Sequence, residues 1–382
     1  MGVLNLDRTP SLAEEDIVIF NDSVGRFFDE KAPESRVARW REDGVVERAF
    51  WVESAEAGLS CLSIPEEYGG MGGDYRHEAV LMEQLGAKGV DGFGLSLHNA
   101  IVAPYILHCG TEEQKRRWLP KMATGELLGC FGLTEPTGGS DPGAMTTSAE
   151  LVGDEWRVTG TKRWIGLASV ADVAIVWART TDGIRGFLVE TNAEGFRAVD
   201  IDNKLALRAS IQCDVFLENV RGELLPDAAG LSAPFSCLTE ARYGIVWGVM
   251  GAARASLDAA IDRSTTREVF GGPIGGKQLV QARLADSFVE FEKGMLLALH
   301  LGRLKDAHTL TPEQVSVGKL NNVREAIRIA HAAREILGGD GVTSEFGVMR
   351  HLANLEAVRT YEGTDDIHTL VIGRALTGLA AF

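Results

Sequence analysis

Residues 131–145 read FGLTEPTGGSDPGAM, and the pattern of the chain changes at this stretch. Before it, Ile17, Phe20 and Val24 keep helical spacing, and GTEEQKRRWLPKM opens with a Thr111…Gln114 capping box. After it, to about residue 220, short β-rich segments alternate with turns: EWRVTGTKRW, ADVAIVWART, RGFLVE and IQCDVFLENV. Long helical patterns return beyond residue 233. The sequence therefore predicts an α+β fold.

The domain boundaries are placed where these patterns change. We predict an N-terminal helical domain over residues 1–130, a β domain over 131–232 and a C-terminal helical bundle over 233–382. This order differs from the strand–helix alternation of a Rossmann domain, and no GxGxxG motif follows a predicted strand. A flavin or nucleotide would therefore be bound by a different structural motif.

Composition excludes several classes of protein. The 382 residues are 45% hydrophobic and 24% charged, which is typical of a globular chain. A formal net charge of −16 argues against a nucleic-acid partner, because phosphate binding needs a concentrated basic face. The five cysteines are scattered and form no CxxC pair, so we expect buried thiols, with neither a disulfide frame nor a zinc site.

The sequence also shows no pattern typical of a membrane-spanning segment, a signal peptide or a myristoylation site. No apolar run approaches the roughly 18 residues that cross a bilayer. The first residues, MGVLNLDRTPSLAEEDI, lack the basic region and apolar core of a signal peptide, and Leu6 stands where a myristoylation signal needs Ser or Thr. We expect a cytoplasmic protein without integral membrane association.

A second informative stretch, TYEGTDDIHTLVIGRALTG, covers residues 360–378. Ile367, Leu370 and Val371 keep the spacing of a helix with one buried stripe, and Thr364 is a natural N-cap for it. Asp365 and Asp366 would then lie in the first turn, where carboxylates are favoured by the helix dipole.

Glu362 is not explained by this helix. It precedes the cap and is followed by Gly363, which tolerates unusual backbone angles, so its side chain could be aimed into a cavity. The alternative is an ordinary solvated glutamate in a loop.

The loop at residues 131–145 has its own candidate role. Thr134, the pair Gly138–Gly139 and Ser140 bring hydroxyl and backbone N–H groups into one loop, which suits a phosphate or the polar edge of a heterocycle. The alternative is a plain connector.

With both stretches in view, the sequence resembles the acyl-CoA dehydrogenase family of flavoproteins. The segments RWLPKMATGELLGCFGLTEPTGGSD, KRWIG, ARYGIVWG, REVFGGPIGGKQ, EILGGDGV and TYEGTDDIH occur in family order over almost the whole chain. The C-terminal half is most similar to the glutaryl-CoA dehydrogenase branch, and GFGLSLHNAIVAPYILHCGTEEQ to the long-chain branch. The resemblance implies that the β domain is a small barrel and that the C-terminal bundle has four helices.

The resemblance also implies an activity. Glu362 matches the base that removes the α-proton of an acyl-CoA thioester, while the backbone N–H of the same residue donates to the thioester carbonyl. The β-hydride leaves for N5 of FAD, and the electrons pass to an electron-transfer flavoprotein. An acyl-CoA oxidase that uses O2 and releases hydrogen peroxide is the alternative enzyme, and a non-catalytic flavin-binding protein is the alternative class.

Family roles carry over to matching positions. Arg267, Phe270 and Gln278 match a segment that reaches the FAD of a neighbouring subunit, so a homotetramer is expected. No metal site is implied, since Asp365, Asp366 and His368 have no second group to support one. The substrate-binding positions implied are Ser140, Arg242, Tyr361 and Gly363. The cofactor-binding positions implied are Phe131, Leu133, Thr134, Gly139, Ser140, Trp164, Arg267, Phe270, Gln278, Gly338, Gly339, Thr364 and Asp366.

Two departures from the family pattern matter for specificity. The glutaryl branch uses an arginine to bind the distal carboxylate, but residues 91–99, DGFGLSLHN, contain none, so a monocarboxylic acyl group is expected. The chain reads Trp164-Ile165-Gly166-Leu167 where the family commonly has a hydroxyl residue after the isoleucine. Loss of that hydroxyl would open a small volume that could ease the approach of O2.

Overall fold

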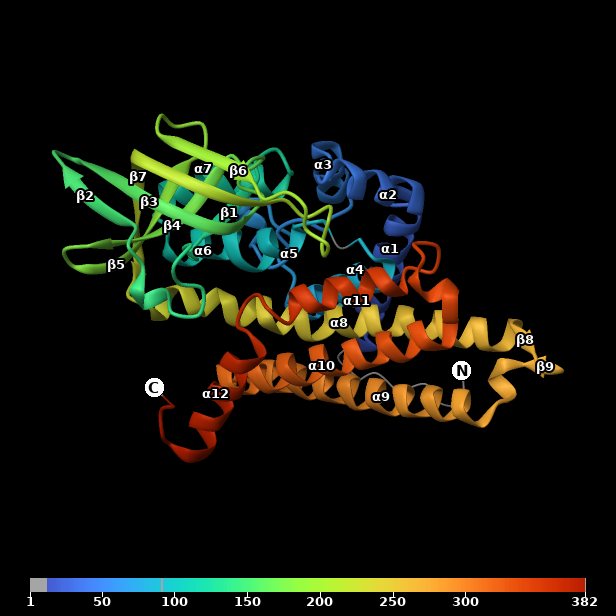
Figure 1. The fold of residues 1–382 in the computed structure, drawn as a ribbon. Coiled ribbons are helices and arrows are strands. Elements are labelled where there is room, and N and C mark those ends of the chain that lie inside the picture. Colours follow the sequence, from blue (N-terminus) through green and yellow to red (C-terminus); the bar gives the residue numbers. More distant parts are fainter. Residues whose placement is uncertain (1–11, 91, 382) are drawn as a thin grey trace. The chain divides into compact units, whose positions relative to one another are not determined.

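The computed structural model describes residues 12–90 and 92–381 (Figure 1). The described residues divide into two compact units, one drawn from residues 12–30, 75–90 and 242–381, the other from Lys31–Asp74 and Gly92–Ala241. Most of the N-terminal segment on which the signal-peptide and myristoylation predictions rest lies outside the described residues. Among the helices described, none has the length and apolar character needed to cross a membrane.

The second unit contains the main sheet. Its strands are β1 (Gly129–Gly132), β2 (Ser148–Val152), β3 (Glu155–Gly166), β4 (Val173–Thr180), β5 (Gly183–Glu190), β6 (Phe196–Asp200) and β7 (Gln212–Ala229). The predicted β-rich segments are confirmed as β3, β4, β5 and the first half of β7. The structure adds β1, β2 and β6, which are short and therefore carry little alternating pattern.

The strand pairings form a ring. β4 pairs with β2, β2 with β3, β3 with β7, β7 with β5, and β5 again with β4, while β1 joins β4 and β6 joins β7. The β1–β4 and β2–β4 pairs are parallel and the others are antiparallel. The β2–β4 step rests on the single pair Ser148–Arg179.

Short helices accompany this sheet in the second unit. They are α2 (Glu34–Asp43), α3 (Arg48–Glu56), η2 (Glu66–Tyr68), α5 (Leu95–Leu97), η3 (His98–Val102), α6 (Ala103–Cys109), α7 (Glu112–Ala123) and η4 (Pro142–Ala144). The predicted capping box at the start of α7 is confirmed: Gln114 N donates to Thr111 Oγ1 at 3.2 Å and Thr111 N to Gln114 Oε1 at 2.9 Å. Tyr105 of α6 is fully buried and stacks on Phe131 of β1 at 5.4 Å.

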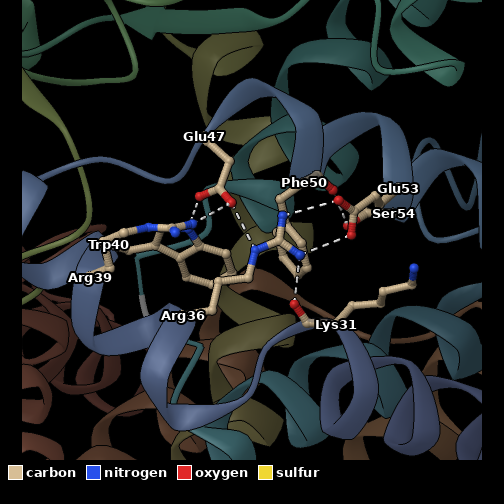
Figure 2. Close-up of polar contacts among 8 residues, drawn as sticks. All are labelled: Lys31, Arg36, Arg39, Trp40, Glu47, Phe50, Glu53 and Ser54. Carbon is tan, nitrogen blue, oxygen red and sulfur yellow. Dashed lines mark hydrogen bonds and ion pairs between the residues drawn. The ribbon is translucent and has the colours of Figure 1, made fainter.

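Arg36 joins α2 to α3 (Figure 2). Its Nε donates to Glu47 at 2.8 Å, and its two terminal nitrogens bind the two oxygens of Glu53 at 2.9 and 3.0 Å. The guanidinium also lies over the rings of Trp40 and Phe50, 5.4 and 5.0 Å from their centroids. A bidentate ion pair that also lies against aromatic rings is a strong form of the interaction, so Arg36 holds α2 against the start of α3.

We expect Arg36→Met to lower the free energy of unfolding by about 2–4 kcal/mol, because Glu47 and Glu53 would lose their counter-charge while partly shielded from water. Arg39→Met is the matched control: Arg39 also pairs with Glu47, at 3.1 Å, but is 59% exposed and should matter by about 0–1 kcal/mol. Urea unfolding followed by tryptophan fluorescence measures both changes. Equal losses of unfolding free energy in the two variants would contradict the stabilising role assigned to Arg36.

The first unit is helical. It contains α1 (Glu15–Lys31), α4 (Tyr75–Lys88), α8 (Ser232–Thr266), η5 (Ile274–Gly276), α9 (Gln278–Asp306), α10 (Pro312–Leu337), η6 (Gly338–Val342), α11 (Val348–Val358) and α12 (Asp365–Thr377), with a small hairpin of β8 (Glu268–Val269) and β9 (Gly272–Pro273) between α8 and α9. The first residues of α8 belong to the second unit, and the last residue of α1 as well. The long helices predicted beyond residue 233 are confirmed as α8, α9 and α10.

One buried amide ties the three long helices together. Nδ2 of Asn322, on α10, donates to the backbone oxygens of Val246 on α8 at 3.1 Å and Gly294 on α9 at 3.0 Å. Close packing of α4 on α8 depends on glycine, because a Cβ at Gly251 would collide with the backbone of Glu83. The bonds of Asn322 therefore join α8, α9 and α10 into one frame that carries the turns at their ends.

Candidate active site

Glu362 lies on a strained turn between α11 and α12. Its φ is +52°, a left-handed value that non-glycine residues adopt at a cost of about 1 kcal/mol or more, and Gly363 follows with φ +95°. Thr364 then caps α12, its Oγ1 accepting from Ile367 N at 3.2 Å, which confirms the predicted N-cap. A turn of this kind persists only where its surroundings hold it.

Two cations hold the turn through its backbone. Nζ of Lys319 donates to the carbonyl oxygens of Tyr361 at 2.6 Å and Gly363 at 2.7 Å. Nε of Arg242 donates to the carbonyl oxygen between them, that of Glu362, at 2.8 Å. Three successive carbonyls therefore accept hydrogen bonds from charged donors, which are stronger than neutral ones.

The carboxylate of Glu362 is left without such a partner. Its Oε2 is buried and accepts no hydrogen bond from any described residue. Burial raises the pKa of Glu362, while the charges of Lys319 and Arg242 act to lower it. A buried carboxylate with a raised pKa is a stronger base than one in water, and this one is free to take a proton.

His368 lies behind the turn. It is the one buried side chain of α12, and a Cβ at Gly363 would be 2.8 Å from its Nε2, so position 363 requires glycine for space as well as for φ. Burial, then the charges of Lys319 and Arg242, lower the pKa of His368 to about 4. The imidazole is therefore neutral at pH 7.

The rest of α12 partly follows the prediction. Asp365 and Asp366 begin the helix as expected, and Asp365 also accepts from Arg324 and Arg359, both at 2.9 Å. The apolar stripe differs from the prediction of a buried one, since its members are only half-buried: Ile367, Leu370 and Val371. The last turn of α12 is the more exposed part of the helix, with Leu376 81% exposed.

In the second unit, the loop after β1 is fixed by a buried ion pair. Glu135 Oε1 accepts from Nζ of Lys162, on β3, at 2.9 Å, and Oε2 accepts from the N and Oγ1 of Thr146, both at 2.7 Å. Burial alone would raise the pKa of Glu135, but hydrogen bonds from the Thr146–Thr147 segment and from Lys162 outweigh it and hold that pKa at about 2. Lys162 also donates to Leu133 O at 3.2 Å.

This ion pair lies beside the predicted flavin-contacting residues of the unit. Trp164 is at a bulge in β3, with φ +61°, and its ring is half exposed. The neighbouring Arg163 N donates to Thr134 O at 2.9 Å, so the structure brings the loop and the bulge together. Phe131 and Leu133 point toward the core of the unit, whereas Gly139 and Ser140 are exposed.

The remaining predicted residues lie elsewhere in the first unit. Phe270 and Gly271 are the two central residues of the β8–β9 hairpin, both with positive φ, and Phe270 is 94% exposed. Arg267 precedes this hairpin and Gln278 begins α9. Nothing lies within 4 Å of the Cβ that residues at Gly338 and Gly339 would carry, so the backbone there is open.

Within the first unit, the structure does not bring Gly338 and the β8–β9 hairpin close to the Glu362 turn. Gly338 follows the last residue of α10, whereas Lys319 is in its second turn and binds the Glu362 turn. At 1.5 Å per residue, the two positions are about 28 Å apart along the helix. In Figure 1, α12 and the β8–β9 hairpin accordingly lie at opposite ends of α9 and α10.

A side chain at Gly166 would make ordinary contacts with its neighbours. A Cβ there would be 3.4 Å from Gln212 Nε2, its cross-strand partner, and 3.4 Å from Leu97 Cδ2. The space that the missing hydroxyl residue would occupy is thus bordered by an amide and an apolar side chain. The expected opening beside Gly166 stays a prediction.

The sequence did not lead us to Lys319, which holds the Glu362 turn, or to Lys162, which holds the loop after β1. Lys319 stands on the buried face of α10, four residues after Val315, and Lys162 stands two residues after Gly160 and four after the buried Val158 of β3. The sequence signal that could have identified them is a lysine at a position that the helical or strand periodicity places on the buried face. Charged residues are rarely buried without a partner, so such a lysine indicates a buried polar contact.

Comparison with known proteins agrees with this architecture along the chain. Three family models match: acyl-CoA dehydrogenase, N-terminal domain, over residues 14–126, middle domain over 130–220, and C-terminal domain over 228–377. The short-chain specific acyl-CoA dehydrogenase, mitochondrial, of Bos taurus is 34% identical over 328 residues, covering 83% of this chain and 79% of that protein.

Solved structures give the same result. A glutaryl-CoA dehydrogenase from Mycobacterium smegmatis is 48% identical, with 97% of each chain covered and a TM-score of 0.94, and a second structure of a glutaryl-CoA dehydrogenase from this organism is in complex with FADH2. A chain from a study of the electron transferring flavoprotein of Acidaminococcus fermentans is 31% identical, with 98% and 99% covered and a TM-score of 0.88. The chain therefore belongs to the acyl-CoA dehydrogenase family, whose members are FAD-dependent oxidoreductases.

The described residues fit that cofactor. An exposed indole on a strained bulge, as at Trp164, offers a flat surface that a ring can cover. The open backbone at Gly338–Gly339 can be approached closely by a ligand, and the capped start of α12 carries free N–H groups of the kind that bind phosphate.

Proposed function

We propose that this enzyme desaturates a monocarboxylic acyl-CoA thioester at the α,β-position, with Glu362 as the base that removes the α-proton. The observation that carries the proposal is Oε2 of Glu362, a buried oxygen without a hydrogen-bond partner among the described residues, on a half-buried side chain mounted on a strained turn. Two structural glutamates, Glu135 and Glu53, instead have both carboxylate oxygens hydrogen-bonded.

The backbone of the same turn supports the chemistry. Because Lys319 and Arg242 bind the carbonyls of the turn, those oxygens point toward the cations. The N–H of Glu362 has no acceptor among the described residues. It is available to the thioester carbonyl, where it would stabilise the negative charge that develops as the α-proton moves to Glu362.

FAD, when bound, supplies the acceptor for the hydride that leaves the β-carbon. We propose that Arg242, Tyr361, Gly363 and Ser140 contact the substrate. The residues proposed to bind FAD are Phe131, Leu133, Thr134, Gly139, Ser140, Trp164, Arg267, Phe270, Gln278, Gly338, Gly339, Thr364 and Asp366.

The proposed acyl group is monocarboxylic, although the Mycobacterium smegmatis relative is a glutaryl-CoA dehydrogenase. Residues 91–99 contain no lysine or arginine, and His98 and Asn99 are buried in hydrogen bonds with Met122, Leu59 and Cys61. A Cβ at Gly94 would be 2.9 Å from Leu167 Cδ1, so an apolar side chain packs against the backbone of this segment.

We expect pentanoyl-CoA to be a better substrate than glutaryl-CoA, which has the same chain length but ends in a carboxylate. Burying that carboxylate without a cation costs several kcal/mol, so kcat/KM should differ by about 10²–10³-fold. The measurement is anaerobic loss of the yellow absorbance band on mixing with each thioester, followed by steady-state rates. Comparable kcat/KM values would show that a cation from another segment binds the distal group.

Further parts of the proposal rest on the family resemblance. We propose a homotetramer in which Arg267, Phe270 and Gln278 complete a neighbour's cofactor site, because the structure separates them from the Glu362 turn. An electron-transfer flavoprotein as acceptor, a cytoplasmic location and the domain division at residues 130 and 232 remain predictions. The ring of strand pairings supports a small barrel, and the frame of α8, α9 and α10 supports a four-helix bundle.

A further inference from the structure

Lys319 is a charged side chain buried with no carboxylate partner. It is 1% exposed, and its ammonium forms no ion pair with any described residue. Its hydrogen bonds go to the carbonyl oxygens of Tyr361 and Gly363, with the ring of Tyr361 5.9 Å from its Nζ. Burying an ammonium group costs free energy unless it is hydrogen-bonded. Lys319 therefore needs the two carbonyl oxygens, and we expect the conformation of the turn to need Lys319.

The geometry points to Lys319 as a positioning residue for the base. We propose that Lys319 sets both the direction and the proton affinity of Glu362: from the rigid helix α10 it clamps the carbonyls on either side of Glu362, and its charge stays near the carboxylate without bonding to it. The inference rests on the proposed function, because it assigns Lys319 a role through Glu362.

The clamp explains how the strained turn persists. A residue with φ +52° tends to relax to a negative φ, and relaxation would rotate the two flanking peptide planes. The plane before Glu362 carries the carbonyl of Tyr361, which Lys319 binds, and the plane after it carries the carbonyl of Glu362, which Arg242 binds, so rotation of either plane breaks a charged hydrogen bond, while Lys319 also holds the next carbonyl, that of Gly363. A displacement of the base by about 1 Å is enough to slow a reaction on the order of 10²-fold.

The charge of Lys319 acts separately from the clamp. Charged and titratable groups face Glu362 from three elements: Lys319 on α10, Arg242 on α8, and His368 with Asp365 on α12. Burial raises the pKa of Glu362, and Lys319 is the largest influence that lowers it. Because the ammonium forms no ion pair, it lowers this pKa while leaving the carboxylate free to accept the substrate proton.

The test compares Lys319→Met and Arg328→Met in the holoenzyme. Arg328 is on the same helix, 73% exposed and paired with Glu325, so its loss controls for removal of a cation from α10. We expect Lys319→Met to lower kcat by about 10–10²-fold with little change in KM. The acid limb of its kcat/KM–pH profile should move to higher pH, because the pKa of Glu362 rises when the ammonium is removed. A residue with only a structural role would not move that limb.

Hydrogen exchange gives a readout that does not depend on activity. The amides of Tyr361, Ile367 and His368 are bonded within or beside the turn, to Ala357 O, Thr364 Oγ1 and Thr364 O. We expect them to exchange faster in Lys319→Met and at the wild-type rate in Arg328→Met. If Lys319→Met is not obtained as folded holoenzyme, Lys319→Gln, which keeps N–H donors but not the charge, is put through the same measurements.

Glu362→Gln separates the two hypotheses. If Glu362→Gln is inactive while Lys319 variants keep wild-type kcat, pH limb and exchange, the role of Lys319 is refuted and that of Glu362 stands. If Glu362→Gln turns over like wild type, the proposed base is wrong and the inference falls with it.

Discussion

Glu362→Gln is expected to lower kcat by about 10²–10⁴-fold while leaving the fold and FAD content unchanged. A positioned base contributes a factor of that size. Glutamine matches the shape of the side chain and keeps the backbone N–H of the turn, so the substitution removes only the basic oxygen. Rates are measured with pentanoyl-CoA and an artificial electron acceptor, and FAD content from the absorbance spectrum.

Glu313→Gln is the matched control for this change. Glu313 lies exposed in the first turn of α10, six residues before Lys319. Its substitution should leave kcat near that of wild type. Full turnover by Glu362→Gln would mean that another group takes the α-proton.

Lys162→Met is expected to lower the free energy of unfolding by about 3–5 kcal/mol, the range for breaking a buried ion pair by removing one partner. Lys162 is fully buried and Glu135 nearly so, and the pair is 2.9 Å apart. Removal of the ammonium leaves the Glu135 carboxylate in the core with only its hydrogen bonds to Thr146 and Thr147. Urea unfolding at pH 7 measures the loss.

The pH dependence of this loss has a definite sign. The pKa of Glu135 in the folded protein is about 2, below its ordinary value of 4.5, so the carboxylate contributes stability above about pH 4.5 that is lost as pH falls toward 2. Removing Lys162 raises the folded pKa of Glu135. The difference between wild type and Lys162→Met should therefore shrink as pH falls and Glu135 becomes protonated.

Two further variants check the explanation. Lys121→Met removes an exposed lysine that pairs with Glu126 at 3.5 Å and should cost about 0–1 kcal/mol. Adding Glu135→Gln to Lys162→Met removes the uncompensated charge and should recover part of the loss. A Lys162→Met deficit that stays constant from pH 7 to 3 would disprove the ion-pair mechanism.

The sequence predicted those features that repeat or follow a local rule. The period of the apolar residues located α8, α9 and α10, and the short-range chemistry of capping located Thr111 and Thr364. Strands as short as β1 and β6 were not predicted, because four or five residues do not establish a period.

The site was predicted only where motifs are contiguous. Glu362 and its glycine are neighbours in sequence, so the turn could be proposed from TYEGTDD alone. Lys319 is 42 and 44 residues from the carbonyls it binds, and Lys162 is 27 residues from Glu135. Such pairs are made by tertiary packing, and a single sequence gives no sign of which distant backbone oxygen an inward-facing lysine will find.

The two inward lysines also give each unit a chemical reporter. Lys162 belongs to the second unit and Lys319 to the first, and both ammonium groups are out of reach of water in the folded chain. An amine-directed reagent in solution can modify either one only while the unit around it is open. Labelling at position 162 and at position 319 therefore records the opening of each unit separately, within one protein and without any substitution.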